Sequence, residues 1–161
     1  KRWANGFYYY SIVGSYFTGG KYDDAADKRA IFDSLIRIDT AVKANGSVVG
    51  GQNQLDLMGI RLVYKSGRQV VHGDMNTRSV QSLDVKGDSI TSIKIYYSNT
   101  PDKNKARVKA LAVTTWTGHF LFAGNPSNPF ISVDVPSDET FIGFAGSSGT
   151  EIDSLGVVTR I

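Results

Sequence analysis

The chain has 161 residues, of which 41% are hydrophobic and 20% are charged, and its net charge is +3. These values are typical of one soluble globular domain, and the small excess of positive charge gives little support for a nucleic-acid partner. The absence of cysteine excludes disulfide scaffolds, thiolate metal sites and cysteine nucleophiles. No apolar run approaches the length of about 18 residues that spans a bilayer.

The balance of residue types favours strands over helices. The chain has thirteen Asp but two Glu, together with 17 Gly. Asp and Gly favour turns, whereas Glu favours helices. Runs with period-two character and many β-branched or aromatic residues predict strands at residues 6–13, 34–44, 57–67, 78–85, 89–98, 107–118, 119–124, 130–135, 141–146 and 151–161. The pattern predicts an all-β sandwich, barrel or prism.

Turn-rich segments lie between these strands. They are residues 44–47 (ANGS), 65–68 (KSGR), 85–88 (VKGD), 99–104 (NTPDKN), 124–129 (GNPSNP) and 136–139 (PSDE). A weak helix pattern covers residues 23–35, where the acidic start can cap one turn. No linker divides the chain, so we expect one domain over residues 1–161, with an aromatic N-terminal extension at 1–13. Because the start carries no signal-peptide pattern, we expect a piece excised from a larger secreted protein.

Several of these segments resemble one known family. GSYFTGGKYDDAAD (14–27) is similar to the glycine-rich opening strand of jacalin-like lectins, and MGIRLVYKSG (58–67) is similar to their second hairpin. DSITSIKIYY (88–97) and RVKALAVTTWTG (107–118) resemble the next strands. The ending, residues 141–161, is the most specific match, because GTEID resembles the family's Gly-x-x-x-Asp sugar-binding loop.

The resemblance extends over residues 14–161 and implies a jacalin-like β-prism. This fold has three antiparallel sheets of about four strands with pseudo-threefold symmetry. Within the family, the aromatic N-terminal extension resembles most the β-prism domains of bacterial pore-forming cytolysins and biofilm-matrix adhesins. That narrower resemblance implies a secreted lectin that acts in adhesion at a cell surface or in a biofilm matrix.

A carboxylate stands where the closing glycine turn meets an apolar strand. Asp153 in this position has two interpretations. It can be a hairpin residue that bonds its own backbone, or it can accept hydrogen bonds from neighbouring hydroxyls of a pyranose. The resemblance favours the sugar site, in which backbone N–H groups of a side-chain-poor loop donate back to the sugar. The implied carbohydrate-binding residues are Gly149, Thr150, Glu151, Ile152 and Asp153 of the closing loop, with Gly19 and Gly20 of the opposite glycine loop.

We expect one sugar site and a mannose-type ligand. Residues 46–50 (GSVVG) and 124–130 (GNPSNPF), which stand where further sites would lie, carry no carboxylate. In the family, galactose preference accompanies a chain cut before the first glycine loop, whereas here the backbone continues through residues 14–22. The resemblance therefore implies mannose-containing oligosaccharides, above all the branched mannose core of N-linked glycans on glycoproteins.

A second hypothesis is an adhesion module for anionic polysaccharide or membrane surfaces. Lys103, Lys105, Arg107 and Lys109 alternate, which predicts one basic strand face; a solvated or protected sheet edge is the simpler interpretation. The N-terminal aromatics are expected to pack in the core or on a sheet, while one or two can border the site.

No catalytic, cofactor or metal site is expected. His72 and His119 lack ligand spacing, and the acidic segment 23–27 lacks the oxygen spacing of a calcium loop. We expect these to be lone polar residues near turns. No nucleophile motif is present, so the module is expected not to be an enzyme.

Overall fold

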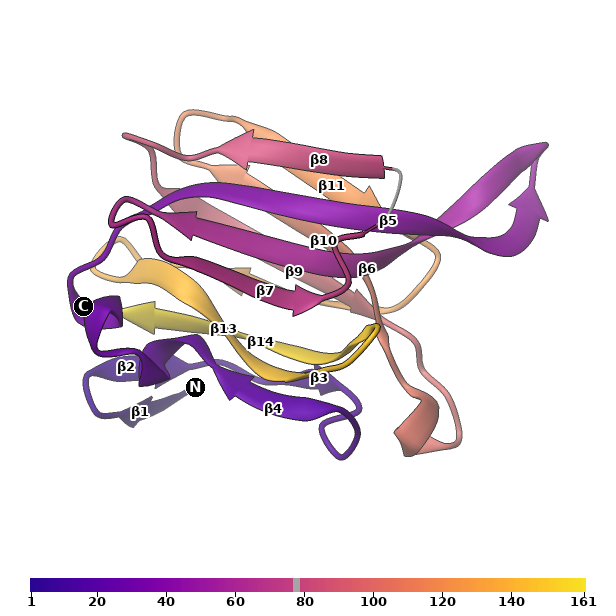
Figure 1. Ribbon diagram of the computed structural model, residues 1–161, viewed down its shortest axis with the longest axis horizontal. Coiled ribbons are helices and arrows are strands. Elements are labelled where there is room, and N and C mark those ends of the chain that lie inside the picture. The colour runs from indigo at the N-terminus through magenta and orange to yellow at the C-terminus, as the bar shows by residue number, and fades with distance from the viewer. Residues whose placement is uncertain (77–78) are drawn as a thin grey trace.

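The computed structural model describes residues 1–76 and 79–161, which form three antiparallel sheets around a shared core (Figure 1). Sheet A has the order β1 (Arg2–Ala4), β2 (Phe7–Tyr9), β14 (Ile152–Arg160), β13 (Thr140–Ser148) and β4 (Gly20–Asp23), and β3 (Val13–Gly14) also pairs with β14. Sheet B has the order β7 (Gln69–Gly73), β6 (Gln52–Tyr64), β5 (Leu35–Val49) and β8 (Ser79–Asp84). Sheet C has the order β11 (Phe120–Gly124), β10 (Val108–Thr115), β9 (Ile90–Tyr97) and β12 (Phe130–Asp134). The predicted all-β prism is confirmed.

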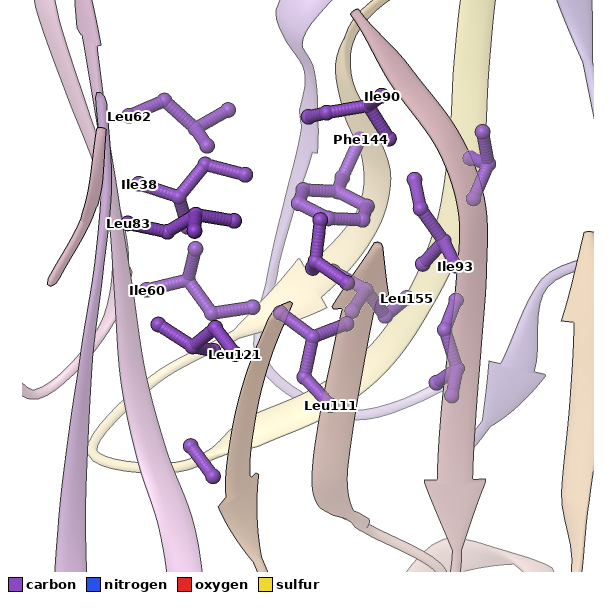
Figure 2. Close-up of a cluster of buried hydrophobic side chains, with 14 of the residues drawn as sticks. Ile38, Ile60, Leu62, Leu83, Ile90, Ile93, Leu111, Leu121, Phe144 and Leu155 are labelled. Atoms are coloured by element: carbon purple, nitrogen blue, oxygen red, sulfur yellow. The ribbon is translucent and has the colours of Figure 1, made fainter. Parts of the chain in front are cut away.

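The inner faces of the three sheets meet in one hydrophobic core (Figure 2). Because strand side chains alternate between faces, every second residue of a central strand points inward. Sheet B contributes Ile38, Ile60, Leu62 and Leu83, sheet C contributes Ile93, Leu111 and Leu121, and sheet A contributes Phe144 and Leu155. Burial of these side chains is the main favourable term in the folding of the prism.

The outer faces of the sheets differ in what covers them. On sheet A, Phe7 of the N-terminal strand packs in a second buried cluster with Ile142 and Val158. On sheet B, the buried Asp39 accepts hydrogen bonds from Arg37 and Arg61. Sheet C instead presents aromatic side chains to solvent.

The hairpin of β5 and β6 is longer than the sequence predicted, and it projects beyond the sheets (Figure 1). The predicted turn at residues 44–47 is wrong, because β5 continues to Val49 and the chain reverses at Gly50 and Gly51, which both have positive φ. Residues 44–47 form an irregularity in the ladder instead, with the Ser47 N–H donating to Asn45 Oδ1. Turn-forming residues thus produced a bulge rather than an end.

One other prediction changes in the structure, and one strand was not predicted. The helix pattern at 23–35 yields two short 3₁₀ turns, η1 (Asp24–Ala26) and η2 (Lys28–Ile31), capped by the side chains of Asp23 and Asp27. Strand β7 lies in a stretch where no strand was predicted, because its apolar run is short and begins directly after a turn. The strand predicted at 78–85 is β8, although Arg78 lies outside the described residues.

Candidate functional site

Asp153 lies at the start of β14, directly after the turn of the closing hairpin. Its side chain is only 7% exposed. The backbone oxygen of Asp153 accepts a hydrogen bond of 2.7 Å from the Ser15 N–H. This bond fixes the segment that leads into the first glycine loop against the closing hairpin, so a segment near the start of the chain meets one near its end at Asp153.

The first glycine loop contacts the Asp153 carboxylate. A Cβ atom added at Gly19 would lie 2.7 Å from Oδ2 of Asp153 and 2.9 Å from the backbone of Ser148, and Gly19 has a φ of +77°. Both facts require glycine at this position. Gly20 pairs with Ser148 at the end of β13. The structure therefore brings together the glycine pair and the carboxylate that the sequence placed in one site.

The closing turn is small, and its side chains are exposed or partly exposed. The Gly149 N–H donates to the Glu151 carbonyl oxygen at 2.9 Å, and the side chain of Glu151 is 41% exposed. Thr150 is exposed. Ile152 was expected in the loop, but it is the first residue of β14 and its side chain is fully buried in the core. Only the backbone of Ile152 remains available to a ligand.

Arg107 is a site residue that the sequence did not reveal. Its Nε lies 3.5 Å from Oδ1 of Asp153 and 4.0 Å from Oε1 of Glu151. Its Nη1 donates to the carbonyl oxygens of Asn104 and Ala106 at 2.9 and 2.8 Å. The guanidinium is thus held in place and brings a positive charge to the Asp153 carboxylate. This contact joins distant segments, so no local pattern signals it.

The predicted basic strand face is wrong. Lys103 to Lys105 form the 3₁₀ turn η3 (Lys103–Lys105), and β10 begins only at Val108, so the four basic residues do not alternate along one strand. Arg107 faces Asp153, and Lys109 Nζ lies 3.2 Å from Oδ2 of Asp56. Two of the four charges are therefore paired with carboxylates.

Tyr22 contacts the backbone of β14 next to Asp153. Its hydroxyl donates to the Ser154 carbonyl oxygen at 2.9 Å. Burial raises the pKa of Tyr22 well above its usual value, and the carboxylates of Asp24 and Asp153 raise it further. The phenol therefore stays protonated and remains a donor to the backbone next to Asp153.

Two hollows lie near the segments that meet at Asp153. One, of about 610 Å³, lies between the β5–β6 hairpin, residues 74–76 and the side chains of Thr150 and Glu151. The other, of about 350 Å³, lies between residues 12–17 and the segment 97–106. Tyr16 and Phe17 line the second hollow and are exposed. Thr150 and Glu151 of the closing turn line the first hollow, and Ser15, whose N–H donates to the Asp153 carbonyl oxygen, lines the second.

The other N-terminal aromatics have structural roles. Phe7 is buried, as expected of an aromatic on a sheet. The Tyr9 hydroxyl donates to Oδ2 of Asp23, and the Tyr10 hydroxyl donates to Oε1 of Glu139, both at 2.7 Å. Trp3 packs edge-on against Tyr8 with the ring centroids 4.7 Å apart.

The histidines do not form a metal site. Among the described residues, no group of three or more His, Asp or Glu side chains is arranged to hold a metal ion. His72 is not a lone polar residue, as was expected, because its Nε2 lies 2.9 Å from Oδ1 of the buried Asp24. Asp24 also accepts from the Phe144 N–H at 2.8 Å, so this pair ties β7 to sheet A. His119 lies exposed near a turn, as predicted, but its Nδ1 lies 3.8 Å from Oδ2 of Asp88, so it is not a lone polar residue either.

The molecule is a β-prism with a carboxylate held against a glycine loop at the end of its closing hairpin. A profile of the jacalin-like lectin domain matches residues 16–158, and the chain therefore belongs to the jacalin-like lectin family. Members of this family bind carbohydrate and are not enzymes, in agreement with the prediction of a non-catalytic module. No helix among the described residues is long and apolar enough to cross a membrane.

Solved structures share the fold at low sequence identity. A mannose-binding lectin from champedak has a TM-score of 0.72 and 16% identity, covering 99% of this chain and 100% of its own. Artocarpin in complex with mannotriose has a TM-score of 0.69 and 14% identity, and the match covers 94% of this chain and 98% of the artocarpin chain. A lamprey immune protein has a TM-score of 0.72 and 18% identity. The match covers 97% of this chain but only 45% of the lamprey chain. Among curated proteins, none matches the sequence.

Proposed function

We propose that the Asp153 site binds mannose-type sugars, with the branched mannose core of N-linked glycans as the ligand. The observation that carries this proposal is the position of the Asp153 carboxylate against Gly19, at the end of a hairpin with few side chains. A carboxylate can accept from two neighbouring sugar hydroxyls, and the N–H groups of the adjacent loops can donate to the same hydroxyls.

The continuous backbone before the glycine loop supports mannose over galactose. Residues 13–14 form β3 and pair with β14, so the chain enters the loop from within sheet A and no free amine lies there. The champedak lectin is described as mannose-binding, and artocarpin has been solved with mannotriose. An equatorial 4-hydroxyl, as in mannose, can point toward Asp153.

The two hollows support a branched ligand over a single sugar. A further mannose unit placed against Thr150 and Glu151, or against Tyr16 and Phe17, would add contacts without a second cost of association. We expect a mannotriose to bind more tightly than methyl mannoside for this reason. Binding of this kind would attach the protein to glycans of a cell surface or an extracellular matrix.

Calorimetric titration with methyl α-mannoside, a mannotriose and galactose tests the proposal. The parent protein should bind the first two and not galactose. Asp153→Ala should abolish binding, because loss of a charged hydrogen-bonding partner costs about 1.5–3 kcal/mol. Asp138→Ala, which removes an exposed carboxylate elsewhere, is the matched control and should bind normally. Binding of galactose but not mannose, or full binding by a folded Asp153→Ala, would refute the assignment.

A further inference from the structure

The outer face of sheet C carries a shallow aromatic trough. On β10, Ala110 and Ala112 are paired with Gly124 and Phe122 of β11, and with Tyr96 and Lys94 of β9. Because the neighbouring Leu111 points into the core, these paired residues point outward. The central strand therefore supplies a floor of small side chains, and the flanking strands supply larger walls.

The walls of the trough are aromatic and partly open to solvent. The Tyr96 ring packs against Phe122 with centroids 5.6 Å apart and against Phe130 at 5.1 Å. Phe120 and Phe130 are 61% and 49% exposed. A hollow of about 110 Å³ lies between these rings, lined by Ser92, Lys94, Tyr96, Ala112, Thr114, Phe120 and Phe122. Its size suits about one sugar ring, and its lining alternates aromatic rings with hydroxyl groups.

Lys94 places a positive charge beside these rings. Within residues 1–76 and 79–161, no carboxylate lies at ion-pair distance from its Nζ, which lies 5.1 Å from the centroid of the Phe130 ring. Lys109, one strand away, is by contrast paired with Asp56. Asp134, at the end of β12, is opposite Ser92 rather than Lys94, which faces Ser132. The half-buried ammonium is therefore available to an anion that lies on the aromatic rings.

We propose that this trough binds an anionic pyranose, a uronic-acid unit of an acidic polysaccharide, independently of the Asp153 site. The apolar face of the ring stacks on Phe120 and Phe122, which accept C–H groups over their π faces. The carboxylate of the uronate pairs with Lys94 Nζ, and its hydroxyls reach Ser92 and Thr114. We therefore assign binding of an anionic polymer to sheet C rather than to residues 103–109, where Arg107 and Lys109 are paired with carboxylates.

A uronate fits better than a protein partner. A stable protein interface buries about 800 Å² on each side, whereas the trough accommodates about one ring between its walls. A neutral sugar would stack on the rings but give the Lys94 charge no anionic partner. The combination of stacking surface, hydroxyl groups and an unpaired ammonium is matched by a carboxylated sugar.

Affinity measurements with tetragalacturonate, and with its fully methyl-esterified form as the neutral counterpart, test the proposal. The parent protein should bind tetragalacturonate more tightly, and binding should weaken as salt is raised. Lys94→Met should weaken it by about fivefold or more, whereas Lys94→Arg should retain most of it. Phe122→Ala should also weaken binding, because it removes one wall. Lys65→Met, which removes an exposed lysine from the turn between β6 and β7, is the control and should leave binding unchanged.

The outcomes separate this site from the Asp153 site. Asp153→Ala should leave tetragalacturonate binding intact, and Lys94→Met should leave mannotriose binding intact. Equal binding of tetragalacturonate by Lys94→Met and the parent would overturn the proposal. So would failure of the parent to bind it, or a dimer in sedimentation that Phe120→Ala dissociates, because the face would then be an interface between copies.

Discussion

The Nε of Arg107 lies 3.5 Å from Oδ1 of Asp153, which gives the proposed sugar acceptor a fixed cationic neighbour. The guanidinium also bonds two backbone carbonyls of its own segment, so its position does not depend on the ligand. An anchored charge of this kind holds a carboxylate in one orientation before the sugar arrives, which lowers the ordering cost of binding.

Removal of Arg107 should therefore weaken mannoside binding. We expect Arg107→Ala to lower the affinity for methyl α-mannoside by about fivefold, because the Asp153 carboxylate loses its charged partner. The affinity of Arg107→Lys for methyl α-mannoside should lie between those of Arg107→Ala and the parent. Titration calorimetry measures both. A gain in affinity for Arg107→Ala would contradict this role and show that the guanidinium competes with the sugar for the carboxylate.

Gly19 should tolerate no side chain. Gly19→Ala should abolish mannoside binding, because the added Cβ would meet Asp153 Oδ2 and the Ser148 backbone. Gly118→Ala is a matched control: Gly118 also has a positive φ, of +90°, but no atom lies within 4 Å of the added Cβ. Both variants should lose about 1–2 kcal/mol of stability from backbone strain, and Gly19→Ala should lose more than Gly118→Ala because its Cβ also meets the Ser148 backbone. Only Gly19→Ala should lose binding, and equal binding by the two would contradict the close contact.

Acid should destabilise the prism through Asp39 on the outer face of sheet B. Burial alone would raise the pKa of Asp39, but hydrogen bonds from Arg37, Ser82 and Arg61 outweigh it and hold the pKa below its usual value. A carboxyl with a lowered folded pKa contributes stability above its unfolded pKa, near 3.9, and loses it as pH falls through the folded pKa. Denaturant titrations at pH 7, 5 and 3 should show stability falling below about pH 4.

Asp39→Asn isolates this contribution. The variant should lose about 3 kcal/mol at pH 7, because two arginines lose their buried carboxylate partner. It should also show a weaker fall in stability between pH 5 and pH 3 than the parent. Asp138→Asn should behave like the parent at every pH, since Asp138 is exposed. Identical acid profiles for the Asp39→Asn variant and the parent would show that other carboxylates dominate.

Local patterns in the sequence predicted the parts of the fold and site that depend on neighbouring residues. Alternation located most of the long strands, and the sequence GTEID located the end of the closing hairpin. The contact between Arg107 and Asp153 could not be predicted, because it joins segments that only the folded prism brings together. The same holds for His72 and Asp24, a buried pair formed between β7 and the first 3₁₀ turn. The prediction of a turn at residues 44–47 was wrong, because turn-forming residues can form a bulge within a ladder when the flanking strands continue to pair.

The strand order of sheet A makes the proposed sugar site dependent on the whole chain. Strands β3 and β4, which enclose the glycine loop, come from the beginning of the sequence, whereas β13 and β14, with which they pair, come from its end. A chain still being synthesised cannot build the pocket until its last strand is available. Sheets with such distant pairings form slowly, because loop closure precedes any stabilising contact. Glycan binding should therefore be the last property that this domain acquires as it folds, and it would report on completion of the fold.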